Sequence, residues 1–284
     1  MVLYVNGQAS SEITPLDRGL AYGDGLFETI ALVGKQVQLW PAHHQRLQQG
    51  LLRLGIHTDY ATLYQQLCHD VTQALQQWHH DRGVLKITLT RGQGGRGYLP
   101  PIEPCLTRIV HISAWPKGRD KVSIEGASLH LCQHPWSHNT ALAGLKHLNR
   151  LDQVLARQEW HDDGLHEGLM LNQRGQVQSG VMSNVFVQHQ AQLYTPCHAS
   201  AGIDGIMAKQ VVQLAKRLGI KVYQQALDLD FVLASEGLFL TNSLNGIWPV
   251  VSLAAQSFPI TRLTRDLQSV LVGHLETHTE LLTC

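Results

Sequence analysis

The hydrophobic and polar positions of the first 114 residues alternate in patterns that predict strands, turns and two amphipathic helices. Asn6-Gly7 is a strong signal for a hairpin turn, and the segment 23–40 predicts a second hairpin that turns near Gly34-Lys35. A helix is expected from Pro41 to about Gly55, because proline favours the first helical turn and glycine favours the end. The remaining positions predict a helix over the stripe Leu63, Leu67, Val71, Leu75 and Trp78, a strand over VLKITLTR, and a third strand over 108–114.

The pattern changes near residue 115, where Pro116, Lys117 and Gly118 are typical of a linker. The second part is predicted to contain a strand over VSIEGASLHL, a helix after Arg150, strands over GLMLN, QVQSG and NVFVQHQ, a helix from about Ile206 to Leu218, a strand over IKVYQQAL, a short helix, a strand over GLFLTN, and a last helix near Thr261. Helices and strands mix without a strict βαβ order. We therefore expect two α+β domains, residues 1–114 and 115–284.

The composition narrows the class of function. The 284 residues include 22 basic and 22 acidic side chains, so the net charge is zero and offers no general attraction to nucleic acid or to an anionic membrane. No apolar run approaches the ~20 residues of a membrane helix. The N-terminus lacks the basic start and apolar core of a signal peptide. These features favour a cytoplasmic protein that acts on small molecules.

Seventeen histidines invite a metal hypothesis. His130, His134 and His138 would share one face of a helix, but Pro135 would break that helix. No HExxH motif occurs, and the five cysteines form no CxxC pair. We therefore expect no metal site, and we expect the histidines to be structural or on the surface.

The spacing of Gly92, Gly94 and Gly97 matches the GxGxxG fingerprint of dinucleotide-binding proteins. That fingerprint requires the glycines to open a helix, whose N-terminus receives the pyrophosphate. Pro100 and Pro101 follow the glycines here and exclude such a helix. The segment is better interpreted as a loop that carries Arg96 and Tyr98 toward a ligand, or as a simple turn.

Four segments contain residues suited to a cofactor that bears a phosphate. Lys146 lies beside a glycine and between leucines, and partial desolvation would make its neutral amine available as a nucleophile. Residues 205–207 begin a predicted helix, whose free N–H groups suit an anion, although Asp204 could simply cap that helix. Thr241-Asn242-Ser243 could bind a phosphate or form a turn. Arg46 could bind a phosphate or be a solvated surface arginine.

Six motifs resemble those of the fold-type IV pyridoxal-phosphate enzymes, also called class IV aminotransferases, and within them the aminodeoxychorismate lyases. They span nearly the whole chain in the order of the family, and KHLNRL and RGxGGRGY resemble the lyases more than the aminotransferases. The motifs are RGLAYGDGLFET (18–29), HHQRL (43–47), RGQGGRGY (91–98), GLKHLNRLDQVLAR (144–157), SNVF (183–186) and GIMAK (205–209).

The resemblance implies the fold of that family and a role for each site residue. It implies that Lys146, in the C-terminal domain, forms a Schiff base with pyridoxal phosphate. Its remaining implications are that the phosphate is bound by Arg46, the backbone amides of Ile206 and Met207, Asn242 and Ser243, and that the substrate pocket is formed by Thr29, Arg96 and Tyr98.

One position departs from the family pattern. Relatives usually have a glutamate five residues before the asparagine of SNxF, and it keeps the pyridine nitrogen protonated. Counting back from Asn184 gives Ser179, which can donate a hydrogen bond but stabilises the protonated ring far less. The departure also motivates a rival hypothesis, a non-catalytic relative, against which the retained Lys146 and Arg46 argue.

The activity implied by the resemblance is elimination of pyruvate from 4-amino-4-deoxychorismate to give 4-aminobenzoate, a step of folate biosynthesis. Lys146 would serve first as base and then as acid. The alternative is a fold-type IV aminotransferase acting on D-amino or branched-chain amino acids, which would use the same lysine and a second, keto-acid substrate. The family is typically homodimeric, so we expect a homodimer.

Overall fold

The computed structural model describes residues 1–282, so Cys284, one of the five cysteines, lies outside the described residues. The chain folds into two compact units. Unit 1 comprises Met1–Trp115, Lys146–Asn149 and the C-terminal residues from Leu275, and unit 2 comprises Pro116–Leu145 and Arg150–His274. The change of unit after Trp115 falls one residue from the predicted domain boundary. Residues Lys146–Asn149 belong to unit 1, although the prediction of a single boundary near residue 115 placed them in the second domain.

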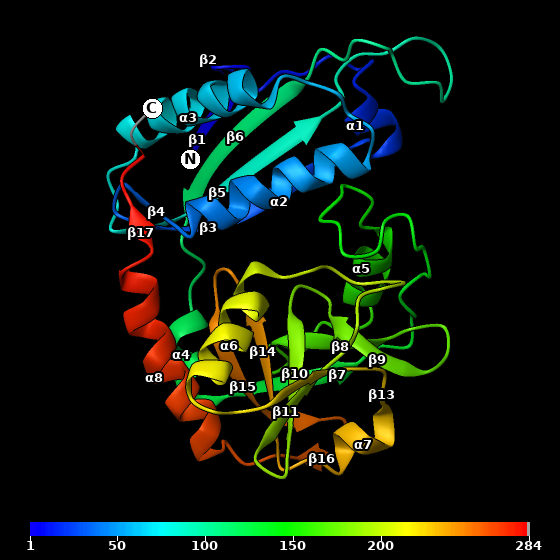
Figure 1. The fold of residues 1–284 in the computed structure, drawn as a ribbon, viewed down its shortest axis with the longest axis vertical. Helices are drawn as coiled ribbons and strands as arrows, with labels where there is room; N and C mark the ends of the chain where they lie inside the picture. Colours follow the sequence, from blue (N-terminus) through cyan, green and yellow to red (C-terminus); the bar gives the residue numbers. More distant parts are fainter. Residues whose placement is uncertain (283–284) are drawn as a thin grey trace. The chain divides into compact units, whose positions relative to one another are not determined.

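Unit 1 is built on a seven-stranded sheet in the order β17-β4-β3-β5-β6-β1-β2 (Figure 1). Its strands are β1 (Val2–Val5), β2 (Gln8–Ala9), β3 (Gly25–Val33), β4 (Gln36–Gln38), β5 (Arg82–Thr90), β6 (Thr107–Ala114) and β17 (Thr279–Glu280). All neighbouring strands are antiparallel. The predicted turn at Asn6-Gly7 is confirmed: both residues have positive φ, 50° and 80°, as a type I′ turn requires.

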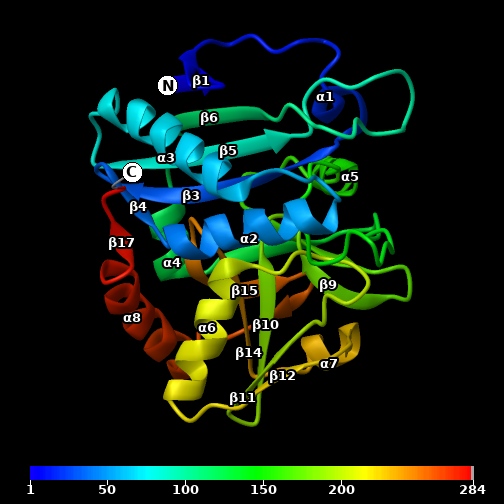
Figure 2. The same ribbon diagram turned by 45° about the horizontal axis from the view of Figure 1, so that its top comes forward.

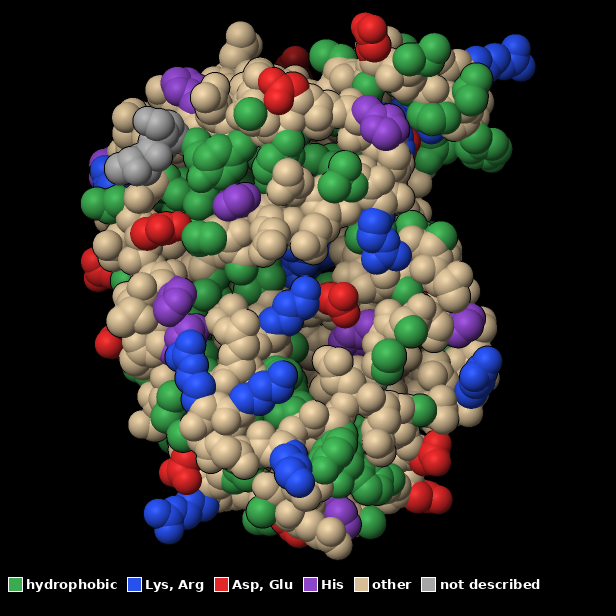
Figure 3. Space-filling view, viewed as in Figure 1, with side chains coloured by type: hydrophobic (Ala, Val, Ile, Leu, Met, Phe, Trp, Pro, Cys, Tyr) green, Lys and Arg blue, Asp and Glu red, His purple; other side chains and the backbone are tan. Residues whose placement is uncertain are grey.

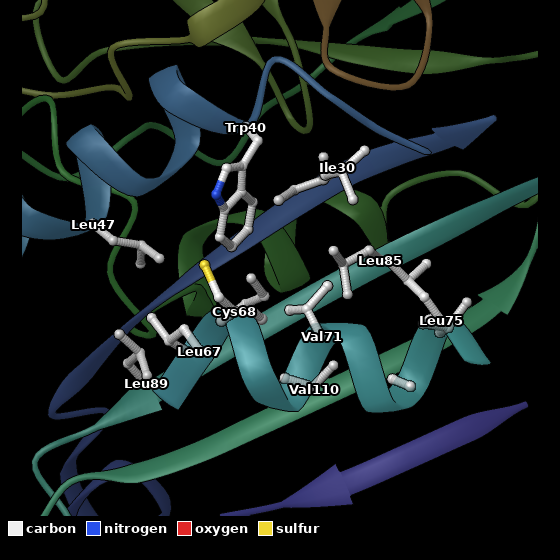
Figure 4. Close-up of a cluster of buried hydrophobic side chains, with 14 of the residues drawn as sticks. Ile30, Trp40, Leu47, Leu67, Cys68, Val71, Leu75, Leu85, Leu89 and Val110 are labelled. Carbon is white, nitrogen blue, oxygen red and sulfur yellow. The ribbon is translucent and has the colours of Figure 1, made fainter. Parts of the chain in front are cut away.

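Helices α2 (Trp40–Arg53) and α3 (Tyr60–Gln76) cover one face of this sheet (Figures 1 and 2), and the short α1 (Arg18–Tyr22) precedes β3. Pro41 lies in the first turn of α2, as predicted. The two helices bury their leucine stripes against β3, β5 and β6, and Figure 4 shows this core around Trp40, Leu67 and Val71. From Leu26 to Ile30 buried and half-buried residues alternate along β3, so Phe27 and Thr29 project from the face that the helices do not cover.

Unit 2 contains a ten-stranded sheet, mostly antiparallel, whose order is β12-β11-β10-β14-β15-β7-β8-β9-β13 with β16 paired to β15. Its strands are β7 (Ala127–Leu131), β8 (Glu167–Leu171), β9 (Gln176–Gly180), β10 (Asn184–His189), β11 (Gln192–Thr195), β12 (Val222–Gln224), β13 (Leu227–Asp228), β14 (Gly237–Asn242), β15 (Gly246–Leu253) and β16 (Gln256–Ser257). Its helices are α4 (Arg119–Glu125), α5 (Leu151–Arg157), α6 (Ile206–Arg217), α7 (Leu229–Leu233) and α8 (Arg262–Glu276).

Two predicted strands of unit 2 are wrong in part. The first half of VSIEGASLHL is the helix α4, which buries Val122 and leaves Ile124 exposed. Gly126, with φ of 95°, ends this helix, and only the following residues form a strand. The segment IKVYQQAL forms two short strands: β12 pairs with β11, and β13 pairs with β9.

The predicted α+β class is confirmed. Within residues 1–282, no helix has the length and apolar character needed to cross a membrane. Of the spaced histidines, His130 lies 3.0 Å from Glu159 and His134 lies 3.1 Å from Asp152. Over the same residues, the acidic, histidine and cysteine side chains form no group of three placed to hold a metal ion.

Candidate active site

A buried cluster of ionisable groups lies between β3 and α2 in unit 1. The Glu28 side chain on β3 is 1% exposed, and it meets His43 and Arg46 from α2. His43 and Arg46 are three residues apart, so both project from the same face of the helix. Arg46 Nε donates to Glu28 Oε1 at 2.8 Å, and Arg46 Nη2 donates to Glu28 Oε2. His43 Nδ1 lies 2.7 Å from the same Oε2.

The cluster has a defined charge state. Burial alone would raise the pKa of Glu28, but the Arg46 guanidinium and the hydrogen bonds from Arg46 and His43 lower it to about 2. Burial lowers the pKa of His43 below 6.5, against the opposing effect of Glu28. The positive charges of Arg46 and Lys146 lower it further. Glu28 is therefore an anion at neutral pH and His43 is neutral, with Nδ1–H donated to the carboxylate.

Lys146 is held against β3 by the main chain. Its carbonyl accepts a hydrogen bond from the N–H of Phe27 at 3.0 Å, and the N–H of Leu148 donates to Gly25 O at 3.0 Å. Its Nζ lies 4.2 Å from the centre of the Phe27 ring, so the ring face shields one side of the amine from water. The side chain is half-buried. A lysine shielded in this way suits reaction with a carbonyl group.

The polar face of the sheet carries the predicted substrate residue Thr29. Phe27 and Thr29 alternate with Glu28, so they project from the face opposite the buried cluster. Thr29 pairs directly with Lys86 of β5, and Lys86 Nζ lies 5.4 Å from the Phe27 ring centre. Lys86 was not among the predicted site residues, although its place between the core residues of VLKITLTR put it on this face.

The loop after β5 carries the other predicted substrate residues, Arg96 and Tyr98. Both are exposed, Tyr98 by 83%. Hydrophobic side chains gather on this loop, at the upper right of unit 1 (Figure 3). No helix begins in the loop, as the two prolines predicted.

Arg18 holds the loop after β5 through hydrogen bonds to the backbone of that loop. The side chain is buried, its Nη1 donates to the Gly97 carbonyl at 3.2 Å, and its Nη2 donates to the Tyr98 carbonyl at 2.9 Å. Asp24 accepts hydrogen bonds from both Arg18 and Arg91, at 2.9 and 2.8 Å. The pKa of Asp24 is lowered, because these two arginines outweigh the raising effect of burial. The motif RGLAYGD thus includes a structural support for RGQGGRGY.

In unit 2, the N-terminus of α6 offers backbone donors. Gly205 is its N-cap, and this residue provides no side-chain cap. The predicted alternative, a cap by Asp204, is wrong: Asp204 Oδ1 instead lies 3.2 Å from His198 Nδ1. A Cβ on Gly205 would lie 1.9 Å from Asn184 Oδ1, so only glycine fits before Ile206 and Met207.

The other predicted cofactor residues of unit 2 lie on β9, on β14 and in the turn that follows β14. Ser179 is 2% exposed, and its hydroxyl donates to the Gly180 carbonyl at 2.7 Å. Asn242 Oδ1 accepts hydrogen bonds from the N–H groups of Leu244 and Asn245, at 3.0 and 2.8 Å, so Asn242 stabilises a turn. Ser243 lies half-buried in that turn.

Glu167, a buried carboxylate on β8, was also not among the predicted residues. It accepts hydrogen bonds from the N–H of Met182 at 3.2 Å and from the Ser183 hydroxyl at 3.0 Å. Burial raises its pKa, although these bonds oppose the shift. Glu167 holds the turn that leads into SNVF. The signal in the sequence was a lone acidic residue at the start of an apolar strand.

Comparisons with known proteins agree with these motifs. Residues 25–253 match the model of the family described as amino-transferase class IV. The chain is 30% identical to an aminodeoxychorismate lyase of Vibrio harveyi, over 95% of this chain and 99% of the relative. A crystal structure of 4-amino-4-deoxychorismate lyase from Pseudomonas aeruginosa superposes with a TM-score of 0.91 and 38% identity, covering 97% of this chain and 100% of that one. A putative branched-chain-amino-acid aminotransferase of Methanocaldococcus jannaschii is 27% identical, over 89% of this chain and 88% of the relative.

Proposed function

The chain belongs to the class IV amino-transferase family, and we propose that it is a pyridoxal-phosphate-dependent lyase that converts 4-amino-4-deoxychorismate to 4-aminobenzoate and pyruvate. The observation that carries the proposal is the placement of Lys146. Its amine lies on the Phe27 ring, close enough to the buried Arg46–Glu28–His43 cluster to affect the pKa of His43. A shielded lysine near a fixed arginine is the arrangement that a phosphorylated aldehyde cofactor needs.

The residues present fit the cofactor. A phosphate requires donors that are fixed in place, and Arg46 is held by two hydrogen bonds to Glu28, while the first turn of α6 has no side-chain cap. Among the described residues, the buried hydroxyl of Thr241 has no hydrogen-bond partner, so it is a group that a ligand would satisfy.

We assign the roles that the motifs imply, residue by residue. Lys146 would hold the cofactor covalently. Arg46, the amides of Ile206 and Met207, and Asn242 and Ser243 would bind its phosphate. Ser179 would face the pyridine nitrogen, and Thr29, Arg96 and Tyr98 would contact the substrate. Of these, Asn242 fits least directly, since its side-chain oxygen is already engaged by the turn.

The proposed reaction requires two proton transfers by Lys146. Bound pyridoxal phosphate supplies an electron sink for the carbon that bears the substrate's amine. The Lys146 amine would take the proton from that carbon and later return a proton to the departing enolpyruvyl group. The Phe27 ring would restrict water near Nζ, and Arg46 would keep the phosphate, and so the reacting carbon, in place.

The alternative activity is amino transfer, which the similarity to the aminotransferase of M. jannaschii favours. It would employ the same Lys146 but require a keto acid as second substrate. The higher identity to two lyases, over nearly complete chains, supports elimination instead.

We further propose that the protein is a cytoplasmic homodimer. Exposed apolar side chains on α1 and on the loop after β5 support a surface that a second copy would cover, among them Leu20, Leu99 and Ile102, the last 95% exposed. The four described cysteines are free thiols, as is usual in a reducing compartment.

An absorption spectrum tests the cofactor assignment. Protein purified with pyridoxal phosphate should absorb in the near-ultraviolet to visible range, and borohydride should fix the cofactor on the peptide that contains Lys146. Lys146→Ala should bind the cofactor without a bond that borohydride can trap. Trapping that persists at another lysine in this variant would overturn the assignment.

A further inference from the structure

The carboxylate of Glu28 lies in an apolar environment. Its neighbours on the same face of β3, Leu26 and Ile30, belong to the hydrophobic core of unit 1. The Glu28 side chain is almost fully buried there. A carboxylate in such a place is strongly disfavoured unless it is paired, and a hydrophobic side chain of similar size would pack at least as well. Hydrophobic packing of the core therefore does not account for Glu28.

The partners of Glu28 fix the orientation of one guanidinium. Arg46 presents its Nε and Nη2 edge to the two carboxylate oxygens, and this fork holds the guanidinium plane. His43, through its Nδ1, prevents the carboxylate from rotating away. The Nη1 edge of Arg46 is consequently turned away from Glu28.

We propose that Glu28 is a positioning residue, which holds the Arg46 guanidinium in the orientation needed to bind the phosphate of the cofactor. The inference rests on the proposed function, since it takes Arg46 as the phosphate ligand. It assigns Glu28 no contact with the cofactor or with the substrate.

The same short segment of β3 also contacts Lys146. The N–H of Phe27 donates to the carbonyl of Lys146, and the Phe27 ring lies under its amine, while the adjacent Glu28 holds Arg46 on the other face. The Phe27-Glu28 pair therefore sets the positions of both residues that would hold the cofactor, one at the aldehyde carbon and one at the phosphate.

Charge and geometry make opposite predictions for removal of Glu28. Glu28 is an anion at neutral pH because the Arg46 guanidinium and its hydrogen bonds lower its pKa to about 2. If Coulomb attraction alone governed the phosphate, removing this anion would leave Arg46 uncompensated and tighten binding. If orientation governs, the loosened guanidinium would bind the phosphate more weakly.

The test compares the dissociation constants of pyridoxal 5′-phosphate and of pyridoxal, which lacks the phosphate, by absorption titration of the apoprotein. Glu28→Ala should weaken binding of the phosphorylated form by about tenfold. Its binding of pyridoxal should change by less than about twofold. In an Arg46→Ala background, Glu28→Ala should have no further effect on either ligand.

Asp70→Ala is the matched control. The Asp70 carboxylate is also buried in unit 1, and it accepts from Arg108 Nε at 2.8 Å, so its loss breaks a comparable ion pair in the same unit. Asp70→Ala should lower thermal stability while leaving the ratio of the two dissociation constants unchanged. If Glu28→Ala does not fold, Glu28→Gln replaces it, because the amide keeps the shape of the side chain and loses the charge; the preference for the phosphorylated form should still fall.

Three results would overturn the inference: unchanged or tighter binding of pyridoxal phosphate, an equal loss for both ligands, or an effect of Glu28→Ala that persists without Arg46. Failure of the proposed function is a separate outcome, since the wild-type protein would then form no bond to the cofactor that borohydride traps at Lys146.

Discussion

The hydroxyl of Ser179 donates its hydrogen to the Gly180 carbonyl, so the residue proposed to face the pyridine nitrogen brings no charge to it. An uncharged partner leaves the ring a weaker electron sink than a carboxylate would. Elimination from 4-amino-4-deoxychorismate tolerates this weakness, because formation of the aromatic ring drives the step. Amino transfer has no such driving force, so Ser179 is consistent with the lyase activity.

Ser179→Glu should therefore restore a protonated ring. A carboxylate beside the nitrogen would raise the pKa of that nitrogen by about one unit or more and increase the ratio of protonated to neutral ring about tenfold. Nitrogen-15 NMR of labelled cofactor bound to the protein measures that fraction directly. Ser179→Gln has the same shape without the charge and serves as the control, and equal spectra for the two variants would contradict the assignment of Ser179.

Glu28 also makes a prediction about pH. Its pKa in the folded protein is lowered from 4.5 to about 2, so its pairing stabilises the fold above pH 4.5 and is lost as the pH falls toward 2. The free energy of unfolding of Glu28→Gln should be lower than that of wild type by about 3 kcal/mol at pH 7. The difference should shrink toward zero near pH 2. Urea unfolding across this range measures it, and a constant difference would contradict the ionised pair.

Among the elements, the loop after β5 depends on α1 for its shape. Arg18 donates to the carbonyls of Gly97 and Tyr98, and Asp24 keeps Arg18 in place. Gly94 of RGQGGRGY allows this close approach of the arginine, since a Cβ there would lie 2.7 Å from Arg18 Cδ. The segment that resembled a dinucleotide fingerprint is a supported loop.

Arg18→Ala should release this loop. If Arg96 and Tyr98 contact the substrate, KM should rise about tenfold, the effect of losing roughly one charged hydrogen bond. The affinity for pyridoxal phosphate should not change. Steady-state kinetics and cofactor titration separate the two effects. Arg82→Ala, at the other end of β5, is the control and should leave KM as in wild type. If Arg18→Ala instead lowers cofactor affinity and leaves KM unchanged, the loop contacts the cofactor and the prediction is wrong.

The sequence alone predicted most elements, because their hydrophobic periods were clear. The leucine stripe of α2 and the alternation of β5 are examples. VSIEGASLHL was wrongly predicted as one strand because Val122 and Ile124 alternate with polar residues. The glycines on either side instead begin and end a helix that buries only Val122. Lys146 and Arg46 were predicted as site residues from the motifs. The pairing of Glu28 with His43 and Arg46 was not, since it joins a strand to a helix at a register that spacing does not fix.

For the whole molecule, zero net charge means that anionic ligands must be bound by local groups. In unit 1, the positive charges of Arg46 and Lys146 both act on His43, so such a local group is present. The apolar residues exposed on the same unit, Leu99 and Ile102 among them, support the proposed contact with a second copy of the chain.

Leu99→Asp should weaken the proposed dimer. Leu99 is 83% exposed and lies beside the loop carbonyls that Arg18 holds, so a charge there would be buried in the interface. The dimer dissociation constant should rise about thirtyfold, as for loss of a strong interface contact. Sedimentation analysis measures it. Ile124→Asp, an exposed apolar position on α4, is the control, and an equal response to both changes would place the interface elsewhere.

The most direct test of the proposed activity is a product assay with 4-amino-4-deoxychorismate. The purified protein with pyridoxal phosphate should release pyruvate and 4-aminobenzoate in equal amounts, without a keto acid, and Lys146→Ala should release neither. If no pyruvate forms and the protein instead moves an amino group to 2-oxoglutarate, the chain is an aminotransferase and the proposed lyase activity is wrong.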